Sequence, residues 1–325
     1  MDYARLGSSG LEVSRLCLGC MSFGDASMGR AWVLDEAAAR PILRAAWEAG
    51  INFFDTANVY SAGTSEEIVG TVLKELAPRD EIVLATKVHG EMRPGPNGHG
   101  LSRKAILSEI DNSLRRLQTD HVDLYQIHRF DPATPVEETL EALHDVVKAG
   151  KARYIGASSM WAWQFMKMLK TQEAHGFARF VSMQNHLNLL YREEEREMLP
   201  LCVDEGIGVI PWSPLARGRL ARPWGEVTRR FETDSFGNKI YDAHIEDDEA
   251  INGAVATLAR ARGVTMAQVA LAWVLQKQPV TAPIVGVTKP HQLDEALGAV
   301  ALHLDAAEVA ALEAAYSPRA MAGFE

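Results

Sequence analysis

Cysteines, long apolar segments and an excess of positive charge are scarce or missing in this chain of 325 residues. Its cysteines are Cys17, Cys20 and Cys202, and an odd, low number of this kind indicates reduced thiols in a cytosolic protein. No segment approaches the roughly 20 apolar residues needed to span a bilayer. Residues 1–5 are not followed by the apolar stretch of a secretory signal. The sequence therefore predicts a cytoplasmic protein without a membrane segment.

The balance of charge is acidic. The 33 lysines and arginines are outnumbered by 43 aspartates and glutamates, which gives a formal net charge of −10. That charge argues against non-specific binding of nucleic acid or of an anionic membrane surface. A hydrophobic content of 47% supports a large core, and the chain has no low-complexity linker. We therefore expect a single domain over 1–325, with no nucleic-acid or membrane partner.

Several motifs that define common enzyme classes are absent from the sequence. No G-x-G-x-x-G follows the first predicted strand, because Gly206 and Gly208 meet Pro211 where the third glycine belongs, and no G-x-x-x-x-G-K-[ST] loop occurs. The G-x-S-x-G elbow of acyl transfer is missing, and no histidine has partners at metal-ligand spacing, so no metal site is predicted. Cys17 and Cys20 form a C-x-x-C, but Cys17 lies in a strand-like run, whereas redox pairs open a helix. We interpret them as a core residue and a loop residue.

What the sequence does contain is a regular alternation of strand-like and helical segments. Apolar runs bounded by turn residues predict strands at 15–19, 51–55, 82–87, 122–128, 152–158, 180–184, 207–213 and 281–286. A short hairpin is predicted over 2–15, and helical periodicity fills the gaps between the other strands. Eight strand–helix units predict an α/β fold, a (β/α)8 TIM barrel with an N-terminal β-hairpin. A doubly wound open sheet is the alternative.

Individual helix starts are predicted from capping residues and periodicity. Residues 102–118 carry apolar side chains on one face. Thr134 begins a capping box with a proline at the first helical position, and Thr265 opens another helix in the same way. Pro41 predicts the start of a helix that runs to Trp47.

The ends of the predicted strands favour the barrel over the open sheet. Most of them are polar or small: Gly19, Asp55, Lys87, His128, Ser158, Gln184, Ser213 and Gly286. In a barrel these ends meet on one face, where active sites form, whereas an open sheet concentrates function at one switch point. Three long segments, 20–34, 88–101 and 214–247, are predicted to be functional loops at this C-terminal face.

The last of these loops is basic in an acidic protein. It contains Arg217, Arg219, Arg222, Arg229 and Arg230. These side chains form either a solvated surface or a phosphate clamp, since arginine pairs bidentately with phosphate oxygens. Both interpretations stay open at this point.

Four polar residues at or just after the ends of three consecutive strands permit one kind of chemistry. They are Asp55, Lys87, His128 and Tyr60. If they meet at the barrel mouth, Asp55 and Lys87 form an ion pair, and Lys87 lowers the tyrosine pKa from its reference of about 10. A tyrosine tuned in this way is a usable general acid, and the histidine can orient a carbonyl oxygen. Taken singly, each residue favours a structural interpretation: an ion pair, a loop aromatic and a hydrogen-bonded histidine. The four compatible residues together favour the catalytic one.

At these residues the chain resembles the aldo-keto reductase superfamily. The resemblance rests on the segments 50–57 with Tyr60, the strand that ends at Lys87, 123–128, 150–158, 211–215 and 283–286, and it extends from residue 3 to about residue 315. The segments 182–184 and 192–197 are similar to the bacterial branch that contains the YajO-type reductases, related to potassium-channel β subunits. The resemblance implies a barrel that binds NADP(H) without a Rossmann motif. It also implies hydride transfer between the nicotinamide C4 and the carbonyl carbon of a small aldehyde or ketone, as in alcohol dehydrogenases and carbonyl reductases.

The resemblance assigns roles to residues of this chain. Tyr60 is the implied proton donor, Lys87 and Asp55 tune it, and His128 positions the carbonyl. The implied cofactor contacts are Gly19, Cys20, Met21, Asp55, Ser158, Ser159, Gln184, Trp212, Ser213, Pro214, Leu215, Ala216, Gly218, Arg219, Gly286, Thr288, Lys289, Gln292 and Glu295.

Different parts of this set are expected along different parts of the cofactor. The two serines and Gln184 hold the nicotinamide carboxamide, with Trp212 as a stacking face. Residues 213–218 run along the pyrophosphate, and residues 286–295 surround the adenosine phosphate and adenine. Lys289 and one or more of the loop arginines are the candidates for the 2′-phosphate.

Two other functions stay open. The channel β subunits suggest a regulatory protein that senses bound NADP(H). A Schiff-base aldolase would use Lys87 as nucleophile, although a paired Asp55 would keep that lysine charged and weakly nucleophilic. The substrate pocket is expected among loops around Met21, Phe23, Trp32, Arg129 and Trp161. Neither the substrate nor the oligomeric state follows from the sequence.

Overall fold

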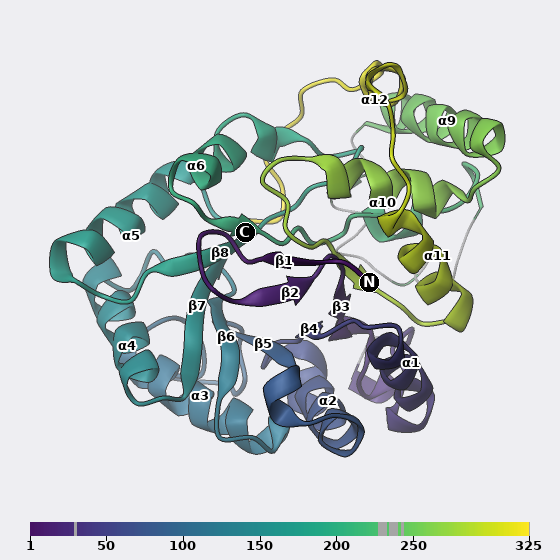
Figure 1. The fold of residues 1–325 in the computed structure, drawn as a ribbon. Coiled ribbons are helices and arrows are strands. Elements are labelled where there is room, and N and C mark those ends of the chain that lie inside the picture. Colours follow the sequence, from purple (N-terminus) through teal and green to yellow (C-terminus); the bar gives the residue numbers. More distant parts are fainter. Residues whose placement is uncertain (29–30, 227–232, 234–239, 242–243, 325) are drawn as a thin grey trace.

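A barrel of eight parallel strands forms the centre of the computed structural model, which describes residues 1–28, 31–226, 233, 240–241 and 244–324 (Figure 1). The strands are β3 (Cys17–Gly19), β4 (Phe53–Asp55), β5 (Val83–Val88), β6 (Val122–Ile127), β7 (Ala152–Ser158), β8 (Phe180–Gln184), β9 (Gly208–Val209) and β10 (Ile284–Gly286). They pair in the order β10-β3-β4-β5-β6-β7-β8-β9. The ring closes where Val209 of β9 bridges to Val280, shortly before β10. The predicted (β/α)8 barrel is confirmed, and the doubly wound alternative is wrong.

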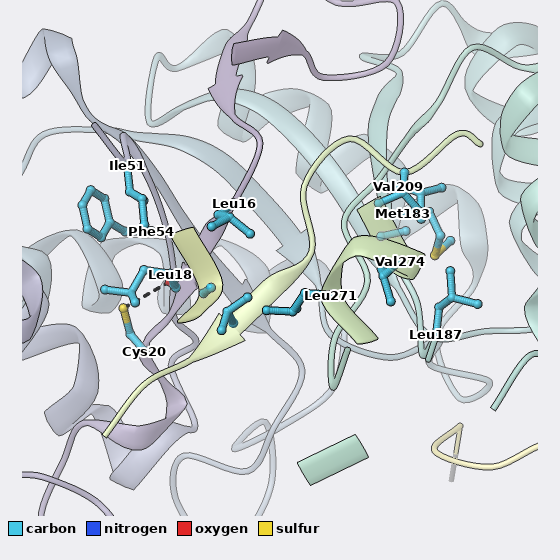
Figure 2. Close-up of a cluster of buried hydrophobic side chains, with 14 of the residues drawn as sticks. Leu16, Leu18, Cys20, Ile51, Phe54, Met183, Leu187, Val209, Leu271 and Val274 are labelled. Carbon is cyan, nitrogen blue, oxygen red and sulfur yellow. Dashed lines mark hydrogen bonds between the residues drawn. The ribbon is translucent and has the colours of Figure 1, made fainter. Parts of the chain in front are cut away.

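Side-chain alternation along the strands creates two layers of core. The inner layer fills the barrel and includes Cys17, Phe53, Val83, Ala85, Leu124, Ile210, Ala282 and Ile284. The next residues along β3 and β4, Leu18 and Phe54, belong to the outer layer between the sheet and the helices. Figure 2 shows part of this outer layer, where Leu271 and Val274 of α10 contribute from the helical side.

The predicted N-terminal hairpin is present as β1 (Tyr3–Arg5) and β2 (Glu12–Ser14), which pair antiparallel. Leu6 and Val13 are fully buried and join the inner core. The Ser8 N–H donates to the carbonyl of Gly206, 2.8 Å away, just before β9 begins. The hairpin therefore covers the end of the barrel where the strands start, and it crosses the barrel axis in Figure 1. Only the opposite end, where the strands finish, is left for a site.

Helices surround the barrel. They are α1 (Glu36–Glu48), α2 (Thr64–Leu76), α3 (Arg103–Leu117), α4 (Val136–Lys148), α5 (Ala162–His175), α6 (Met198–Asp204), α9 (Ile245–Arg262), α10 (Met266–Gln276), α11 (Pro290–Val300) and α12 (Ala306–Glu313). The predicted periodic segment 102–118 is α3. Among the described residues, none of these helices has both the length and the apolar character to cross a membrane.

The predicted helix starts are partly right. At α10 the Thr265 hydroxyl accepts a bond from the Gln268 N–H, and the Gln268 side chain accepts one in return, so this capping box is confirmed. The capping box at Thr134 is wrong, because that hydroxyl donates to Asp131 and α4 starts without a side-chain cap. The start at Pro41 is also wrong. Pro41 lies inside α1, which is capped earlier by the Asp35 carboxylate.

Candidate active site

The polar residues at the barrel mouth follow from the same alternation that builds the inner core. On β4, inward-facing Phe53 is followed two residues later by Asp55, and on β5, Ala85 is followed by Lys87. Residues two apart on a strand share a face, so the inward face changes from apolar to charged at the last layer. Both side chains are buried, with exposed fractions of 3% for Asp55 and 0% for Lys87. Burial of two charges requires that they be paired.

The Lys87 ammonium uses all three of its protons on defined acceptors. It donates to Asp55 Oδ1, to the Thr56 carbonyl at 2.8 Å and to the Tyr60 hydroxyl oxygen at 3.2 Å. Burial lowers the pKa of Lys87, but the Asp55 charge and the interaction with Tyr60 outweigh it, so this pKa lies above its ordinary value. Lys87 is thus a fixed cation at neutral pH, which suits charge stabilisation and disfavours attack as a neutral amine.

Asp55 is held by two amides that form a layer beneath the mouth. Its Oδ2 accepts from Gln126 Nε2 and from Gln184 Nε2, each at 2.9 Å, and Gln184 Nε2 also donates to Gln126 Oε1 at 3.1 Å. The sequence reasoning missed Gln126. The signal was available, because Gln126 lies two residues after the inner-core Leu124 on β6. Gly156 leaves room for it, since a Cβ there would lie 3.2 Å from Gln126 Cγ.

Tyr60 opens the short helix Tyr60–Gly63 directly after β4, and its side chain is 9% exposed. The ring of His128 meets the ring of Tyr60 edge to face, with centroids 5.7 Å apart. Ser61 and Ala62 have positive φ angles of 47° and 51°, a strained conformation that is concentrated at functional sites. Because the Tyr60 oxygen accepts a hydrogen bond from Lys87, the hydroxyl proton of Tyr60 points away from that ammonium. The structure therefore brings the four predicted residues together.

A second row of polar residues supports this arrangement from behind. Thr56, whose carbonyl accepts from Lys87, has its hydroxyl 2.9 Å from that of Ser65, which donates to the Cys20 carbonyl at 2.8 Å. Cys20 contributes its backbone here, because its thiol lies fully buried in the outer core (Figure 2). Burial raises the thiol pKa of both Cys17 and Cys20. The core interpretation is therefore right for Cys17, and Cys20 is a buried residue, so its thiol does not face the mouth.

The residues expected at the carboxamide end lie side by side at the ends of β7, β8 and β9. The Trp212 Nε1–H donates to Ser159 Oγ at 2.9 Å, and Ser158 Oγ donates to the Gln184 carbonyl at 2.7 Å. The Trp212 ring stacks on His186 with centroids 4.1 Å apart, and it is partly exposed. Gln184 Nε2 donates to Asp55 and to Gln126, so both amide protons of this side chain are used beneath the mouth.

The segment 213–218 has an unusual backbone for residues other than glycine. Positive φ angles occur at Ser213 (53°), Ala216 (47°) and Arg217 (56°), and also at Gly218 (93°). Within this segment the Ala216 N–H donates to the Ser213 carbonyl at 2.9 Å, and the Gly218 N–H donates to the Leu215 carbonyl at 2.8 Å, so the backbone forms successive tight turns. In the loop that follows, the Arg219 guanidinium lies over the Tyr241 ring. Arg229 and Arg230 lie outside the described residues.

The residues expected around the adenosine phosphate cluster at the start of α11. Gln292 Oε1 accepts from the N–H groups of Thr288 and Lys289 at 2.8 and 3.0 Å. Lys289 is exposed beside that helix N-terminus, a place that favours anions. Gly286 is exposed at the end of β10, and Glu295 is partly buried one turn into the helix.

The first strand end and the loops that follow it are packed closely. A Cβ on Gly19 would lie 2.7 Å from Ile284 Cγ2, so only glycine fits there without displacement. Met21 next to it is partly exposed. Phe23 was expected to line the pocket, but it is fully buried in the outer core, so that prediction is wrong. Trp161 is 43% exposed and stands edge to face against Phe324, with centroids 5.2 Å apart.

No cluster of three or more histidine, cysteine or acidic side chains in the described parts of the chain is arranged to hold a metal ion. The polar groups brought together at the mouth are an ammonium, a phenol, two amides and one carboxylate that is already paired. Such a set suits proton transfer and hydrogen bonding to a polar organic ligand.

Comparison with known proteins agrees with this fold and site. A model of the aldo/keto reductase family matches residues 15–317, so the chain belongs to that family and is an oxidoreductase. It is 46% identical over 341 residues to a versiconal hemiacetal acetate reductase of Aspergillus parasiticus, covering 99% of this chain and 98% of that protein. It is 44% identical over 344 residues to a putative aryl-alcohol dehydrogenase of Schizosaccharomyces pombe, covering 97% and 96%. An aldo-keto reductase of Alternaria alternata is 42% identical over 346 residues, covering 99% and 93%.

These relatives are fungal. They support the family and do not support the predicted placement in the bacterial YajO-type branch related to channel β subunits.

Proposed function

We propose that the protein is an NADPH-dependent reductase that converts aldehydes or ketones to alcohols, with Tyr60 as the general acid. The observation that carries this proposal is the bonding of Lys87, whose third proton rests on the Tyr60 oxygen at 3.2 Å. That oxygen is an acceptor toward Lys87, so its own proton is available to a substrate oxygen. After the proton has left, the ammonium stabilises the phenolate that forms.

The neighbouring residues prepare and orient this transfer. Asp55 keeps the Lys87 ammonium in place, and the amides of Gln126 and Gln184 hold the Asp55 carboxylate in position. His128 borders the same space as Tyr60, where its imidazole can donate to the carbonyl oxygen and fix its direction.

The residues that would hold NADPH fit its chemistry. Gln184 Oε1 and the serines at 158 and 159 offer polar contacts for a carboxamide, and Trp212 offers a face backed by His186. The turn segment 213–218, which contains the Arg217 cation, is the candidate for the pyrophosphate. Lys289 and the described loop arginines offer cations for a 2′-phosphate, which favours NADPH over NADH. When bound, NADPH supplies the hydride that the carbonyl carbon accepts.

Aromatic aldehydes are the substrate class that we propose first. The relatives include a putative aryl-alcohol dehydrogenase. Aromatic side chains also border the mouth of this chain, where Trp161 stands against Phe324 and Phe130 against Trp163. Trp161 and Trp163 are 43% and 62% exposed, so their rings are accessible to a flat aromatic substrate.

The test is NADPH oxidation with benzaldehyde and small aliphatic aldehydes, followed by absorbance. We expect Tyr60→Phe to lower kcat about 10²- to 10⁴-fold, the range for loss of a general acid, while NADPH binding measured by fluorescence persists. Tyr3→Phe is the matched control, because Tyr3 is exposed on the hairpin at the other end of the barrel. Equal turnover by Tyr60→Phe and the parent would refute the proposed acid. NADPH binding without turnover of any aldehyde would instead favour a sensor of bound cofactor.

A further inference from the structure

Arg129 follows His128 at the C-terminal end of β6, and its side chain is partly buried. Three groups interact electrostatically with its guanidinium: Tyr60 after β4, His89 after β5 and His186 after β8. These three residues come from different strand ends around the barrel. Arg129 therefore lies at the same end of the barrel as the proposed acid, next to His128, whose ring meets that of Tyr60.

Several other buried or partly buried arginines are neutralised by a carboxylate, whereas Arg15 donates to the carbonyls of Leu275 and Val280. The pairs are Arg79 with Asp123, Arg116 with Glu66, Arg192 with Glu195 and Arg319 with Asp248. Arg129 forms no ion pair within the described ranges. Its one hydrogen bond there runs from Nη1 to the carbonyl of His128, at 2.6 Å.

The nearest acid along the chain does not serve Arg129. The Asp131 carboxylate accepts from the N–H groups of Leu101 and Ala133, at 2.8 and 2.9 Å, and from the Thr134 hydroxyl. Burial lowers the pKa of Arg129, and the interaction with Tyr60 offsets this only in part. A cation that is removed from water without a counter-charge carries a desolvation cost that an anionic ligand would repay.

We propose that Arg129 binds a carboxylate on the substrate, so that this site favours aldehydes that carry one. The proposal rests on the reductase function and names its substrate class. A guanidinium has five N–H donors in a planar fork, and among the described residues only one of them has a hydrogen-bond acceptor. The unused edge can take a carboxylate bidentately while Tyr60 and His128 face the carbonyl. The anion sites expected for the cofactor, at 213–218 and Lys289, follow β9 and β10 and are separate from β6.

The experiment compares 3- and 4-carboxybenzaldehyde with their neutral methyl esters. We expect the parent enzyme to prefer at least one acid over its ester by about tenfold or more in kcat/KM. Arg129→Gln should lower kcat/KM for that acid about 10- to 100-fold, the size of a lost charge-assisted contact, and change the ester less than threefold. Arg153→Gln is the control, because that arginine is exposed on the first residues of β7, at the far end of the barrel.

One further measurement distinguishes a substrate carboxylate from a cofactor phosphate as the anion that Arg129 binds. NADPH affinity is measured by fluorescence in parent and Arg129→Gln. Weaker NADPH binding with equal losses for acid and ester would overturn the proposal, because the guanidinium would then serve a cofactor phosphate. A parent enzyme that does not prefer either acid would overturn it too.

If no aldehyde is reduced at all, the proposed function fails separately. The role of Arg129 is then tested by calorimetry, which measures the affinities for 4-carboxybenzyl alcohol and benzyl alcohol. Tighter binding of the acid that is lost in Arg129→Gln supports the carboxylate site, and equal binding of both alcohols refutes it.

Discussion

Replacing Glu194 by glutamine should stabilise the protein increasingly as the pH rises. Glu194 lies in the short helix Glu193–Glu195 after β8 and is 1% exposed. Its Oε1 has no hydrogen-bond partner in the described part of the chain. Burial raises the pKa of Glu194 from 4.5 to about 8, and the nearby Asn185 side chain lowers it only in part. The fold therefore holds this carboxyl in its neutral form.

The sign and size of the effect follow from linkage. Below pH 4.5 the carboxyl is protonated in both the folded and the unfolded chain, so pH has no effect through it. Between 4.5 and about 8 the unfolded chain releases the proton and the folded chain keeps it, so stability falls as the pH rises. At about 1.4 kcal/mol for each pH unit, this interval corresponds to a loss of roughly 5 kcal/mol at most. A glutamine does not titrate and avoids that loss.

The assay is urea unfolding of the parent and Glu194→Gln, followed by tryptophan fluorescence at pH 5, 6, 7 and 8. The difference between the two free energies of unfolding should grow in favour of glutamine by about 1 kcal/mol for each pH unit. Any packing cost of the new amide adds a constant and leaves the slope unchanged. Glu197→Gln is the control, because Glu197 is exposed beside the same helix. A pH-independent difference would refute the assignment of a neutral buried carboxyl.

Two further perturbations test the layers around the site. Gln126→Leu removes one amide donor to Asp55 and the acceptor of Gln184, so kcat for aldehyde reduction should fall about tenfold. Circular dichroism should show an intact fold. An unchanged kcat would show that Gln126 contributes only to packing. Arg116→Met leaves the buried carboxylate of Glu66 without its ion-pair partner, the Arg116 guanidinium, which lies 2.5 Å away. The free energy of unfolding, measured in urea at pH 8, should fall by about 3–5 kcal/mol. Burial already raises the pKa of Glu66, so the cost should be smaller at pH 5, and equal costs at both pH values would contradict this reasoning.

The sequence by itself determined the barrel and most of its elements. Hydrophobic periodicity and capping are local properties, and the eight strand positions, the hairpin, α3 and the cap at Thr265 were predicted from them. Two helix starts were predicted wrongly, because another residue nearby competed for the role of the cap. Pro41 reads as a helix start, but the Asp35 cap begins α1 earlier, and the Thr134 hydroxyl is taken by Asp131.

For the site, the sequence identified the four residues because they lie at or just after the ends of strands that converge in a barrel. The family resemblance then gave each residue its expected role. The sequence reasoning did not show that Cys20 and Phe23 are turned into the core, since that depends on how the loop after β3 packs on the helices. It also missed the ring stack of His186 and Trp212, which joins residues from two loops.

Only the tertiary structure decided which polar groups are satisfied and which are not. The role of Gln126 depends on its hydrogen bonds with Asp55 and Gln184, which lie on other strands. Arg129 is notable because no carboxylate of the described chain reaches it, and Glu194 because its carboxyl is sealed from water. Burial and pairing depend on residues that are distant in the sequence, so tertiary packing decides them. Periodicity depends only on residues that are close in the sequence.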